Sequence, residues 1–234
     1  EAESDGLAAM AATGTIRVPG PVCSGLAGNQ AYMVLESIEM GHSSGRSAEL
    51  AGRQLAEMHR TSQPRFGWFR DNNIGSTPQP NAQADSWIDF WRERRLGFQL
   101  ELAARNGYGG ALQKLGDRLM DRFAVLIDHD PVPSLLHGDL WGGNLAYDSS
   151  GNPVIFDPAV YYGDREADLA MTELFGGFGS AFYAAYREAW PLDPGYALRK
   201  TLYNLYHILN HTNLFGGGYH GQALGMMERL LAEV

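Results

Sequence analysis

The sequence has one cysteine and two lysines among its 234 residues, and its formal net charge is −9. A single cysteine, Cys23, cannot form an intrachain disulfide, so we expect a reducing, cytoplasmic compartment and a Cys23 buried as a small hydrophobe. Basic runs are absent, which argues against nucleic acid or an anionic membrane as a partner. No apolar run approaches the roughly 20 residues that a membrane helix needs.

Hydrophobic residues make up 44% of the chain and aromatic residues 11%, which predicts a well-packed α+β globule. The hydrophobic spacing predicts a short β-containing start, with a β-type run at 31–40, followed by a mostly helical body. Turn residues predict an irregular segment at 17–22 and a loop at 63–81. A β-hairpin is expected within 144–157, around the turn DSSGN. Helices are expected at 1–14, 48–60, 84–105, 111–129, 166–175, 180–190, 195–215 and 221–233.

The stretch HGDLWGGNLAYDSSGNPVIFD, residues 137–157, gathers polar groups that a buried core does not tolerate. Asp139 follows a short strand, Asn144 begins the next β-run, and Asp157 ends the returning strand. Because a hairpin brings its ends together, we expect Asp157 beside Asn144 and near Asp139. Such convergent oxygens suit Mg²⁺, and one carboxylate remains to meet a substrate hydroxyl. Phosphoryl transfer needs such a metal site and such a base. The alternative interpretation is an ordinary hairpin with acidic turns.

The spacing also matches the catalytic loop of protein kinases. In that loop the base Asp precedes a metal-binding Asn by five residues, and a second metal-binding Asp follows the next hairpin. This sequence has Gly138 where that loop has an Arg, and Pro158 and Ala159 where Phe-Gly would follow the metal-binding Asp. At these positions the sequence resembles the small-molecule kinases of the same fold, such as aminoglycoside and choline kinases.

Three longer strings narrow the resemblance. HGDLWGGN, FDPAVYYGDREADLAMTELFGGF and YNLYHILNHTNLFGG closely resemble the bacterial type of the fructosamine kinase (ketosamine-3-kinase) family, in the protein-kinase-like and aminoglycoside phosphotransferase superfamily. The resemblance implies a protein-kinase-like two-lobe fold, with a remnant of the β-containing N-lobe at 1–40 and a helical C-lobe at 41–234. It also implies an ATP- and Mg²⁺-dependent kinase that phosphorylates the C3 hydroxyl of ketosamines, on small amines or on glycated protein lysines, and leads to deglycation.

The resemblance assigns roles within the polar stretch. Asp139 matches the catalytic base, and Asn144 and Asp157 match the Mg²⁺ ligands. His137 is expected to support the loop by hydrogen bonding, and Asp168 is expected to hold the loop backbone.

Other residues near this stretch keep two interpretations each. Trp141 stacks on the ketosamine or packs beside the loop. The glycine pair 142–143 is expected to let the backbone turn tightly. The acidic and basic residues at 164–166 are expected to form surface ion pairs rather than line the site. His207 and His211, four residues apart, are expected to be satisfied helix histidines or to line a substrate pocket rather than to bind a metal.

The first forty residues resemble part of a nucleotide-binding site. MVLESIEM resembles the strand and hinge that join the two lobes, which implies that adenine bonds to backbone groups near Glu36 and Ile38. EAESDGL resembles the first-lobe helix in which a Glu pairs with a phosphate-binding Lys. Glu3 is the candidate for that Glu and Glu1 is the runner-up; the alternative for both is an acidic residue that favours a helix N-terminus.

The family's phosphate-covering loop and its Lys precede that helix, so we expect an N-terminally truncated chain that is weak or inactive alone. Lys114 and Lys200 lie in later helical segments and cannot replace that Lys. Two other functions remain open: another small-molecule kinase of the aminoglycoside or choline kinase type, and a non-catalytic, pseudokinase-like binding module. The sequence is silent on the oligomeric state and on the preferred sugar.

Overall fold

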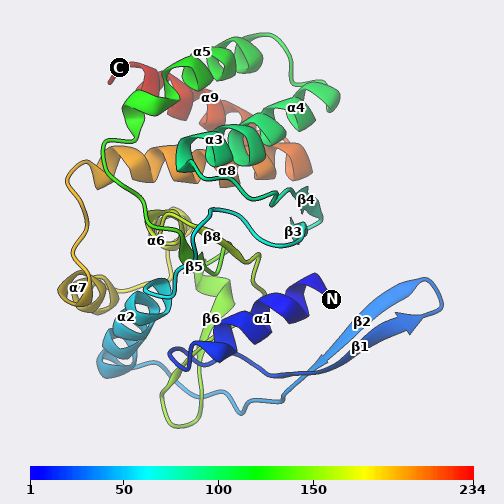
Figure 1. Ribbon diagram of the computed structural model, residues 1–234, viewed down its shortest axis with the longest axis vertical. Helices are drawn as coiled ribbons and strands as arrows, with labels where there is room; N and C mark the ends of the chain where they lie inside the picture. Colours follow the sequence, from blue (N-terminus) through cyan, green and yellow to red (C-terminus); the bar gives the residue numbers. More distant parts are fainter.

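The computed structural model describes residues 1–234, and its main elements are nine α-helices (Figure 1). Every predicted helix is present, although the one expected at 84–105 is interrupted. The helices are α1 (Ala2–Ala12), α2 (Gly45–His59), α3 (Trp87–Trp91), α4 (Phe98–Arg105), α5 (Ala111–Leu126), α6 (Glu166–Leu174), α7 (Ser180–Ala189), α8 (Tyr196–Phe215) and α9 (Gly218–Leu231).

Short strands form four antiparallel pairs: β1 (Pro21–Ala27) with β2 (Gln30–Leu35), β3 (Asn72–Ile74) with β4 (Thr77–Gln79), β5 (Ser134–Leu136) with β8 (Tyr161–Gly163), and β6 (Leu145–Tyr147) with β7 (Pro153–Ile155). The predicted hairpin within 144–157 is confirmed as β6 and β7. The sequence does not predict β1, because Pro21 suggests an irregular segment. Pro21 is the first residue of the strand, where a missing N–H is tolerated. The sequence does not predict the pair β3–β4 either, because turn residues surround both strands.

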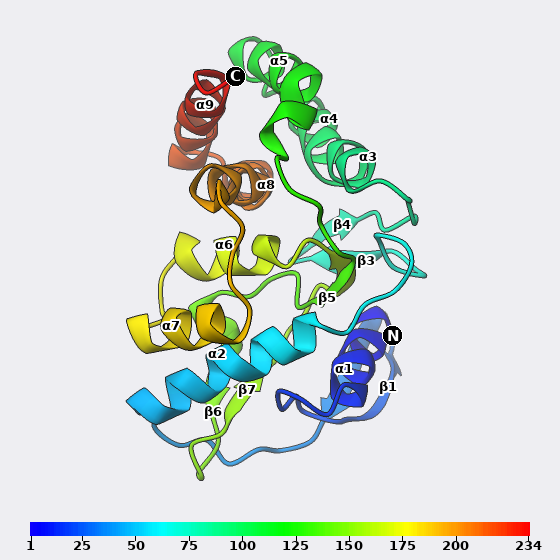
Figure 2. The same cartoon turned by 60° about the vertical axis from the view of Figure 1, so that its left-hand side comes forward.

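The helices gather in two groups on either side of the short central strands (Figures 1 and 2). In one group α8 packs against α9 and α4, and α5 packs against α9. In the other group α2 packs against α7. Helix α6 packs against α8, and α2 packs against β5 and β7, so both groups support the strands that carry the polar loop. None of the helices is both long enough and apolar enough to span a membrane.

One hydrophobic cluster of 43 buried residues runs through the molecule. It includes Leu7 and Met10 of α1 together with residues of every later helix, so the first helix packs on the same core as the rest. The aromatic stripe at 87–91 belongs to it, because Trp87, Phe90 and Trp91 are all buried. The division into lobes at residue 40 stays a prediction.

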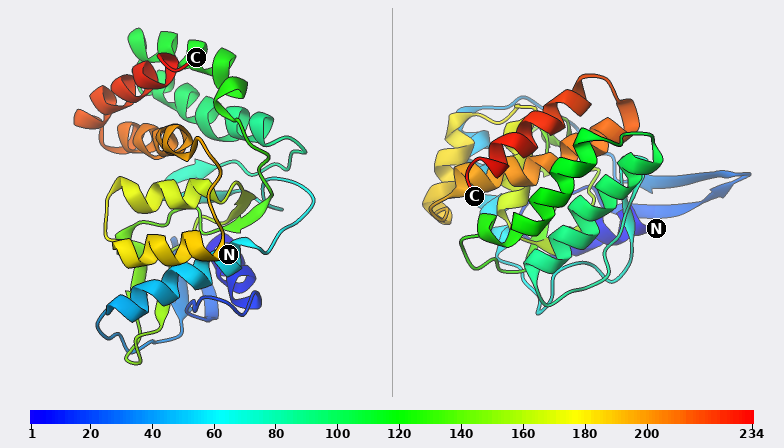
Figure 3. Two further views of the ribbon diagram at one scale, coloured as in Figure 1. Left: turned by 90° about the vertical axis from the view of Figure 1, so that its left-hand side faces the viewer. Right: turned by 90° about the horizontal axis from the view of Figure 1, so that it is seen from above.

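The hairpin β1–β2 projects from this body (Figure 3). Val22 and Leu26 are 68% and 76% exposed, and Cys23 on the same strand is exposed as well. The expectation of a buried Cys23 is therefore wrong. The reason is that β1 and β2 pair only with each other, and the hairpin meets the core through Met33 and Leu35 of β2, which leaves Cys23 on β1 uncovered.

The helix expected at 84–105 is divided by a π-helical segment, Arg92–Gly97, between α3 and α4. This widened turn carries Arg95, whose side chain is fully buried. The Arg95 guanidinium donates to the Pro80 carbonyl at 2.7 Å and lies 4.1 Å from the Tyr161 ring centroid. Periodicity alone does not predict a buried arginine, because a regular 3.6-residue helix was assumed.

Candidate active site

The loop after β5 is held by one buried carboxylate. Asp168, in the first turn of α6, accepts hydrogen bonds from the backbone N–H of His137 at 2.7 Å and of Gly138 at 2.9 Å. His59 of α2 lies 3.1 Å from the same carboxylate through its Nε2. Burial raises the pKa of Asp168, but the hydrogen bond and charge of His59, with the loop amide, outweigh burial and lower it. Asp168 is therefore an anion that fixes the loop backbone.

His137 joins the loop to the strand that returns from the hairpin. Its Nε2 lies 2.9 Å from the Phe156 carbonyl and must donate, so its Nδ1 accepts from the Asp139 N–H at 3.2 Å. Gly138 adopts a φ of 82°, and a Cβ there would lie 2.0 Å from the Ala159 carbonyl oxygen. No side chain fits at position 138, which explains why an Arg is absent from this loop.

The structure brings Asp139, Asn144 and Asp157 together, as the hairpin geometry predicts. The Asn144 Nδ2 donates to the Asp139 carbonyl at 2.9 Å and to the Asp157 carbonyl at 3.4 Å. This leaves the Asn144 Oδ1 and the Asp157 carboxylate without protein partners. Asp157 is the one non-glycine residue with a positive φ, at 57°. Such a conformation is uncommon outside glycine and is typical of functional positions.

The Asp139 carboxylate accepts no hydrogen bond and forms no ion pair. Burial, followed by the negative charges of Asp157 and Asp168, raises the pKa of Asp139 to about 7. A carboxylic acid with such a pKa is a candidate for proton transfer at neutral pH.

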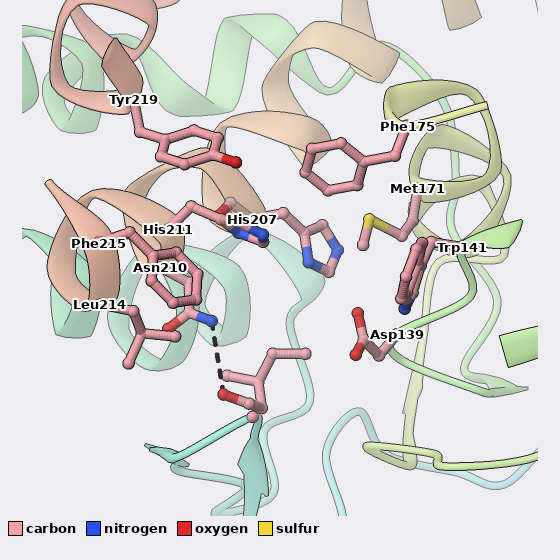
Figure 4. A pocket seen from close by; sticks show the side chains of 12 residues that line it. Asp139, Trp141, Met171, Phe175, His207, Asn210, His211, Leu214, Phe215 and Tyr219 are labelled. Atoms are coloured by element: carbon pink, nitrogen blue, oxygen red, sulfur yellow. Dashed lines mark hydrogen bonds between the residues drawn. The ribbon is translucent and has the colours of Figure 1, made fainter. Parts of the chain in front are cut away.

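Asp139 forms part of the wall of a cavity of about 370 Å³, within the size range of ligand sites (Figure 4). Trp141 lies beside it, and its indole is 41% exposed toward this space. Helix α8 forms much of the opposite wall. The remaining lining residues come from β3–β4, α6, α8 and α9: Ile74, Gly75, Met171, Phe175, His207, Asn210, His211, Leu214, Phe215 and Tyr219.

The two glycines after Trp141 are explained by packing. A Cβ on Gly143 would lie 2.3 Å from the Trp141 ring, and one on Gly142 would lie 2.9 Å from the Gly176 carbonyl oxygen. Neither has a positive φ. The expected tight turn is present as a 3₁₀ turn at Gly142–Asn144, and the need for glycine there is steric, since both glycines let Trp141 and the loop after α6 approach the backbone.

His207 and His211 both line the cavity. Burial, followed by the charge of His211, lowers the pKa of His207 to about 3, so His207 is neutral. The His211 Nδ1 lies 2.8 Å from the His207 carbonyl and donates to it, as an N–H must. Of the interpretations that the sequence left open, the structure supports a pocket-lining pair.

The predicted nucleotide residues lie apart from this cavity. The Glu36 carboxylate pairs with Arg17 at 2.8 Å, and the Glu36 N–H donates to the Gly20 carbonyl at 2.8 Å. Ile38 makes no backbone hydrogen bond, so its N–H and carbonyl are free.

Glu1 and Glu3 differ in their surroundings. Glu1 pairs with Arg70 at 3.2 Å on the surface. Glu3 has no cationic partner, and burial together with the nearby Asp157 charge raises its pKa. Neither lysine reaches these acids, because Lys114 is exposed on α5 and Lys200 pairs with Glu173 at 2.6 Å.

The residues at 164–166 are buried, so the expectation of surface ion pairs is wrong. The Glu166 carboxylate accepts from Arg199 through both oxygens, at 2.7 and 2.8 Å. Asp164 accepts from His129 at 2.8 Å and from the hydroxyl of Tyr203. Sequence alone cannot reveal this network, because its partners come from distant segments.

Sequence reasoning also missed His59, which supports Asp168. His59 follows Leu55 by four residues on the buried face of α2, and a polar residue on such a face is a signal for a buried hydrogen bond. The aromatic residues of the cavity carried no such signal, since buried and cavity-lining aromatics look alike in a helix.

Known proteins resemble this chain in sequence. The fructosamine kinase family model matches residues 1–233. A probable ketoamine kinase of Synechocystis is 53% identical over 232 residues, which cover 99% of this chain and 78% of that protein. A chloroplastic protein-ribulosamine 3-kinase of Arabidopsis thaliana is 48% identical over 236 residues, which cover 99% of this chain and 72% of that protein.

Solved structures agree with the sequence relatives. A protein of Haemophilus somnus that carries a provisional fructosamine-3-kinase name is 31% identical, with a TM-score of 0.89 over 98% of this chain and 78% of that one. A choline/ethanolamine kinase family protein from Mesorhizobium loti shares the fold, at 16% identity and a TM-score of 0.60 over 100% of this chain and 80% of that one. The chain belongs to the fructosamine kinase family, and it is a phosphotransferase that acts on a hydroxyl group.

Proposed function

We propose that the protein transfers the γ-phosphoryl group of ATP to the C3 hydroxyl of a ketosamine, a fructosamine or a ribulosamine, with Mg²⁺ as the cofactor. The O–P bond to the sugar forms as the bond to ADP breaks, and the hydroxyl proton passes to Asp139. The sugar 3-phosphate is expected to be unstable and to separate from the amine, which removes glycation. Ketoamine and ribulosamine kinase names among the relatives support this acceptor class.

The unpartnered Asp139 carboxylate in the wall of the cavity is the observation that carries the proposal. A half-buried anion without a partner is costly for folding, so it has to be explained by a ligand. Its position beside the cavity suits a base that accepts a proton from a bound hydroxyl. The raised pKa of Asp139, about 7, makes this carboxylate a stronger proton acceptor than an ordinary aspartate and still leaves a fraction of it ionised at neutral pH.

The donor set fits a magnesium ion. Asn144 Oδ1 and the Asp157 carboxylate are hard oxygen ligands without protein partners, and Mg²⁺ prefers one or two protein oxygens with phosphate and water. When bound, the ion neutralises phosphate charge and offsets the repulsion between Asp157 and Asp139. The Asn144 amide fixes the spacing, because its Nδ2 binds the carbonyls of both aspartates.

The cavity wall suits a polyhydroxylated acceptor. The exposed Trp141 indole offers an apolar face for a sugar ring or chain, while His211 and Asn210 offer polar groups opposite. The neutral His207 adds no positive charge that would compete for Asp139. We propose Trp141 as the stacking residue and His137 and Asp168 as supports of the loop.

On the nucleotide side we propose that adenine contacts the Ile38 N–H and the Glu36 carbonyl, neither of which is used in a backbone bond. Glu3 is proposed as the partner of a phosphate-binding cation, because it lacks an ion pair while Glu1 is held by Arg70. The acceptor is a small ketosamine or a glycated protein lysine, and the single cysteine favours a reducing, cytoplasmic location.

The test is Mg·ATP-dependent phosphorylation of a ribulosamine and a fructosamine, followed by ³¹P NMR of the product. We expect a sugar 3-phosphate that forms only with Mg²⁺. Asp139→Asn is the matched blank, since it keeps the volume of the side chain but removes the base. Choline and an aminoglycoside serve as competing acceptors, and their preferential phosphorylation would overturn the ketosamine assignment.

A separate experiment tests the expectation that residues 1–234 alone are weak or inactive. The 234-residue chain is compared with any N-terminally extended natural form, at saturating ATP. Equal turnover would contradict that expectation without affecting the proposed reaction. ATP binding without transfer to any acceptor, in either form, would favour the pseudokinase-like binding module.

A further inference from the structure

A second polar cavity, of about 140 Å³, lies where the α5–β5 connection, the start of α6 and the α7–α8 connection meet. His129 and Asp193 line it, and the Glu166 carboxylate lies close to both of them. The donor atoms of His129, Glu166 and Asp193 all lie within 4.8 Å of one another. They come from three different segments, so the convergence is a product of the tertiary fold.

His129 has the arrangement of a metal-binding histidine. Its side chain is 8% exposed, and its Nε2 lies 2.8 Å from the Asp164 carboxylate, to which it must donate. That bond leaves Nδ1 as the free ring nitrogen, and Nδ1 is buried without any hydrogen-bond partner. In metal sites a carboxylate commonly holds the other ring N–H in this way and orients the ligating nitrogen.

The two carboxylates also have free lone pairs. The Asp193 carboxylate has no hydrogen bond or ion pair and is exposed, so it can turn toward the cavity. Glu166 receives one N–H of Arg199 on each oxygen, and each oxygen keeps a second acceptor site. Bonds of about 2.0–2.2 Å to a tetrahedral ion place donor atoms roughly 3.5 Å apart. The exposed Asp193 side chain is the ligand that is free to move to reach this spacing.

The charge around the cavity favours a cation. Asp164, Glu166 and Asp193 outnumber the two nearby guanidinium groups. Arg199 is also paired with Asp128, and Arg165 lines the cavity and donates to the Trp190 and Pro191 carbonyls. An anion would meet the same carboxylates and is disfavoured.

We propose that His129, Glu166 and Asp193 form a site for a divalent transition-metal ion of the Zn²⁺ type, with water as the fourth ligand. One imidazole nitrogen and two carboxylates suit such an ion better than Mg²⁺ or Ca²⁺, which prefer oxygen ligands alone. Ser134, whose buried Oγ has no partner and which lines the cavity, can bond that water. The ion would join three connecting segments at the start of α6 and is separate from the phosphoryl-transfer site.

The test uses metal-free protein in excess Mg²⁺, which saturates the proposed active-site ligands. Co²⁺ is titrated and its visible spectrum recorded, and Zn²⁺ is added in thermal unfolding. We expect one Co²⁺ per chain with the strong absorption of a four-coordinate site, and a rise in Tm with Zn²⁺. His129→Gln keeps a donor for Asp164 and is expected to weaken Co²⁺ binding at least about tenfold, as is Asp193→Asn.

Asp130→Asn is the matched control, because Asp130 lines the same cavity but is not one of the three ligands. It removes the same charge as Asp193→Asn and should keep tight binding. His211→Gln controls for a metal at the histidine pair of the larger cavity. Absence of Co²⁺ binding by the unmodified protein, equal loss in Asp130→Asn and Asp193→Asn, or loss only in His211→Gln would each overturn the proposal.

Discussion

Two groups of carboxylates lie between residues 139 and 168 of the sequence but differ in their surroundings. Asp164, Glu166 and Asp168 are buried, and each accepts hydrogen bonds from side chains or backbone amides. Asp139 and Asp157 make no such bonds through their carboxylates, although Asp139 is half-buried. The first group is satisfied by hydrogen bonds and ion pairs within the chain, as buried charges must be. The second group is explained only by ligands that arrive later.

The pKa of Asp139 reflects the free-energy cost of burying its carboxylate without a partner. Burial and the like charges of Asp157 and Asp168 raise its pKa to about 7, whereas Asp168, which has partners, has a lowered pKa. The same residue type therefore has opposite shifts at two positions of one site, because Asp168 has partners and Asp139 has none.

Apart from Asp139 itself, the largest expected effect on catalysis comes from Asp157→Asn. The carboxylate has no protein partner, so its loss should leave the free energy of unfolding unchanged or raise it, because the repulsion with Asp139 disappears. We expect kcat/KM to fall at least about 100-fold, since metal-ion catalysis supplies several kcal/mol. Steady-state kinetics and urea unfolding measure the two effects.

Asp148→Asn is the control for that variant. Asp148 lies at the other end of the same hairpin, where it accepts from the N–H of Ser150 and of Asn152 and pairs with Arg17. We expect it to lower stability and to leave kcat/KM within a few fold. If Asp157→Asn behaved like Asp148→Asn, Asp157 would belong to the structural group.

Arg199→Met should show the reverse behaviour. It leaves the buried Glu166 without its partner, which typically costs about 3–5 kcal/mol of stability. The exposed pair Arg53–Glu188 provides the control, because Arg53→Met should cost no more than about 1 kcal/mol. Equal Cm values for the two variants in urea unfolding would show that burial does not distinguish the pairs.

His207 predicts a pH dependence of stability. Its folded pKa is lowered to about 3 from an unfolded value of 6.5, so below pH 6.5 the unfolded chain binds a proton that the folded chain does not. The free energy of unfolding should therefore fall by about 1.4 kcal/mol per pH unit between those values. Between pH 6.5 and 5 this slope should be shallower in His207→Gln but unchanged in His42→Gln, an exposed histidine. Urea unfolding of all three proteins across this pH range would measure the slopes. Equal slopes in all three would contradict the prediction.

Trp141→Leu is expected to have the smallest effect on stability and a selective effect on binding. The indole is 41% exposed, so little packing is lost. If it stacks on the ketosamine, KM for the acceptor should rise about tenfold while KM for ATP stays unchanged. Trp141→Phe should recover most of the acceptor affinity. A loss of Tm with an unchanged acceptor KM would instead assign Trp141 to packing.

Much of the fold and the active loop could be predicted from sequence because they depend on local patterns. The spacing of Asp139, Asn144 and Asp157 around a hairpin fixes their convergence, and helical periodicity places the helices. The network at 164–166 could not be predicted, because its partners Arg199 and His129 meet it only through tertiary packing. Cys23 was misplaced for the same reason, since composition does not say which strands the core leaves uncovered.

The most direct test measures Asp139→Asn and Asp164→Asn side by side, each by kcat/KM and by urea unfolding. We predict that Asp139→Asn lowers kcat/KM by about 10²–10⁴-fold and leaves stability unchanged or higher, because no partner is lost. We predict that Asp164→Asn lowers stability by about 3 kcal/mol and leaves kcat/KM of the folded protein within about tenfold. Loss of stability in Asp139→Asn with activity retained would contradict the assignment of the unpartnered carboxylates to chemistry.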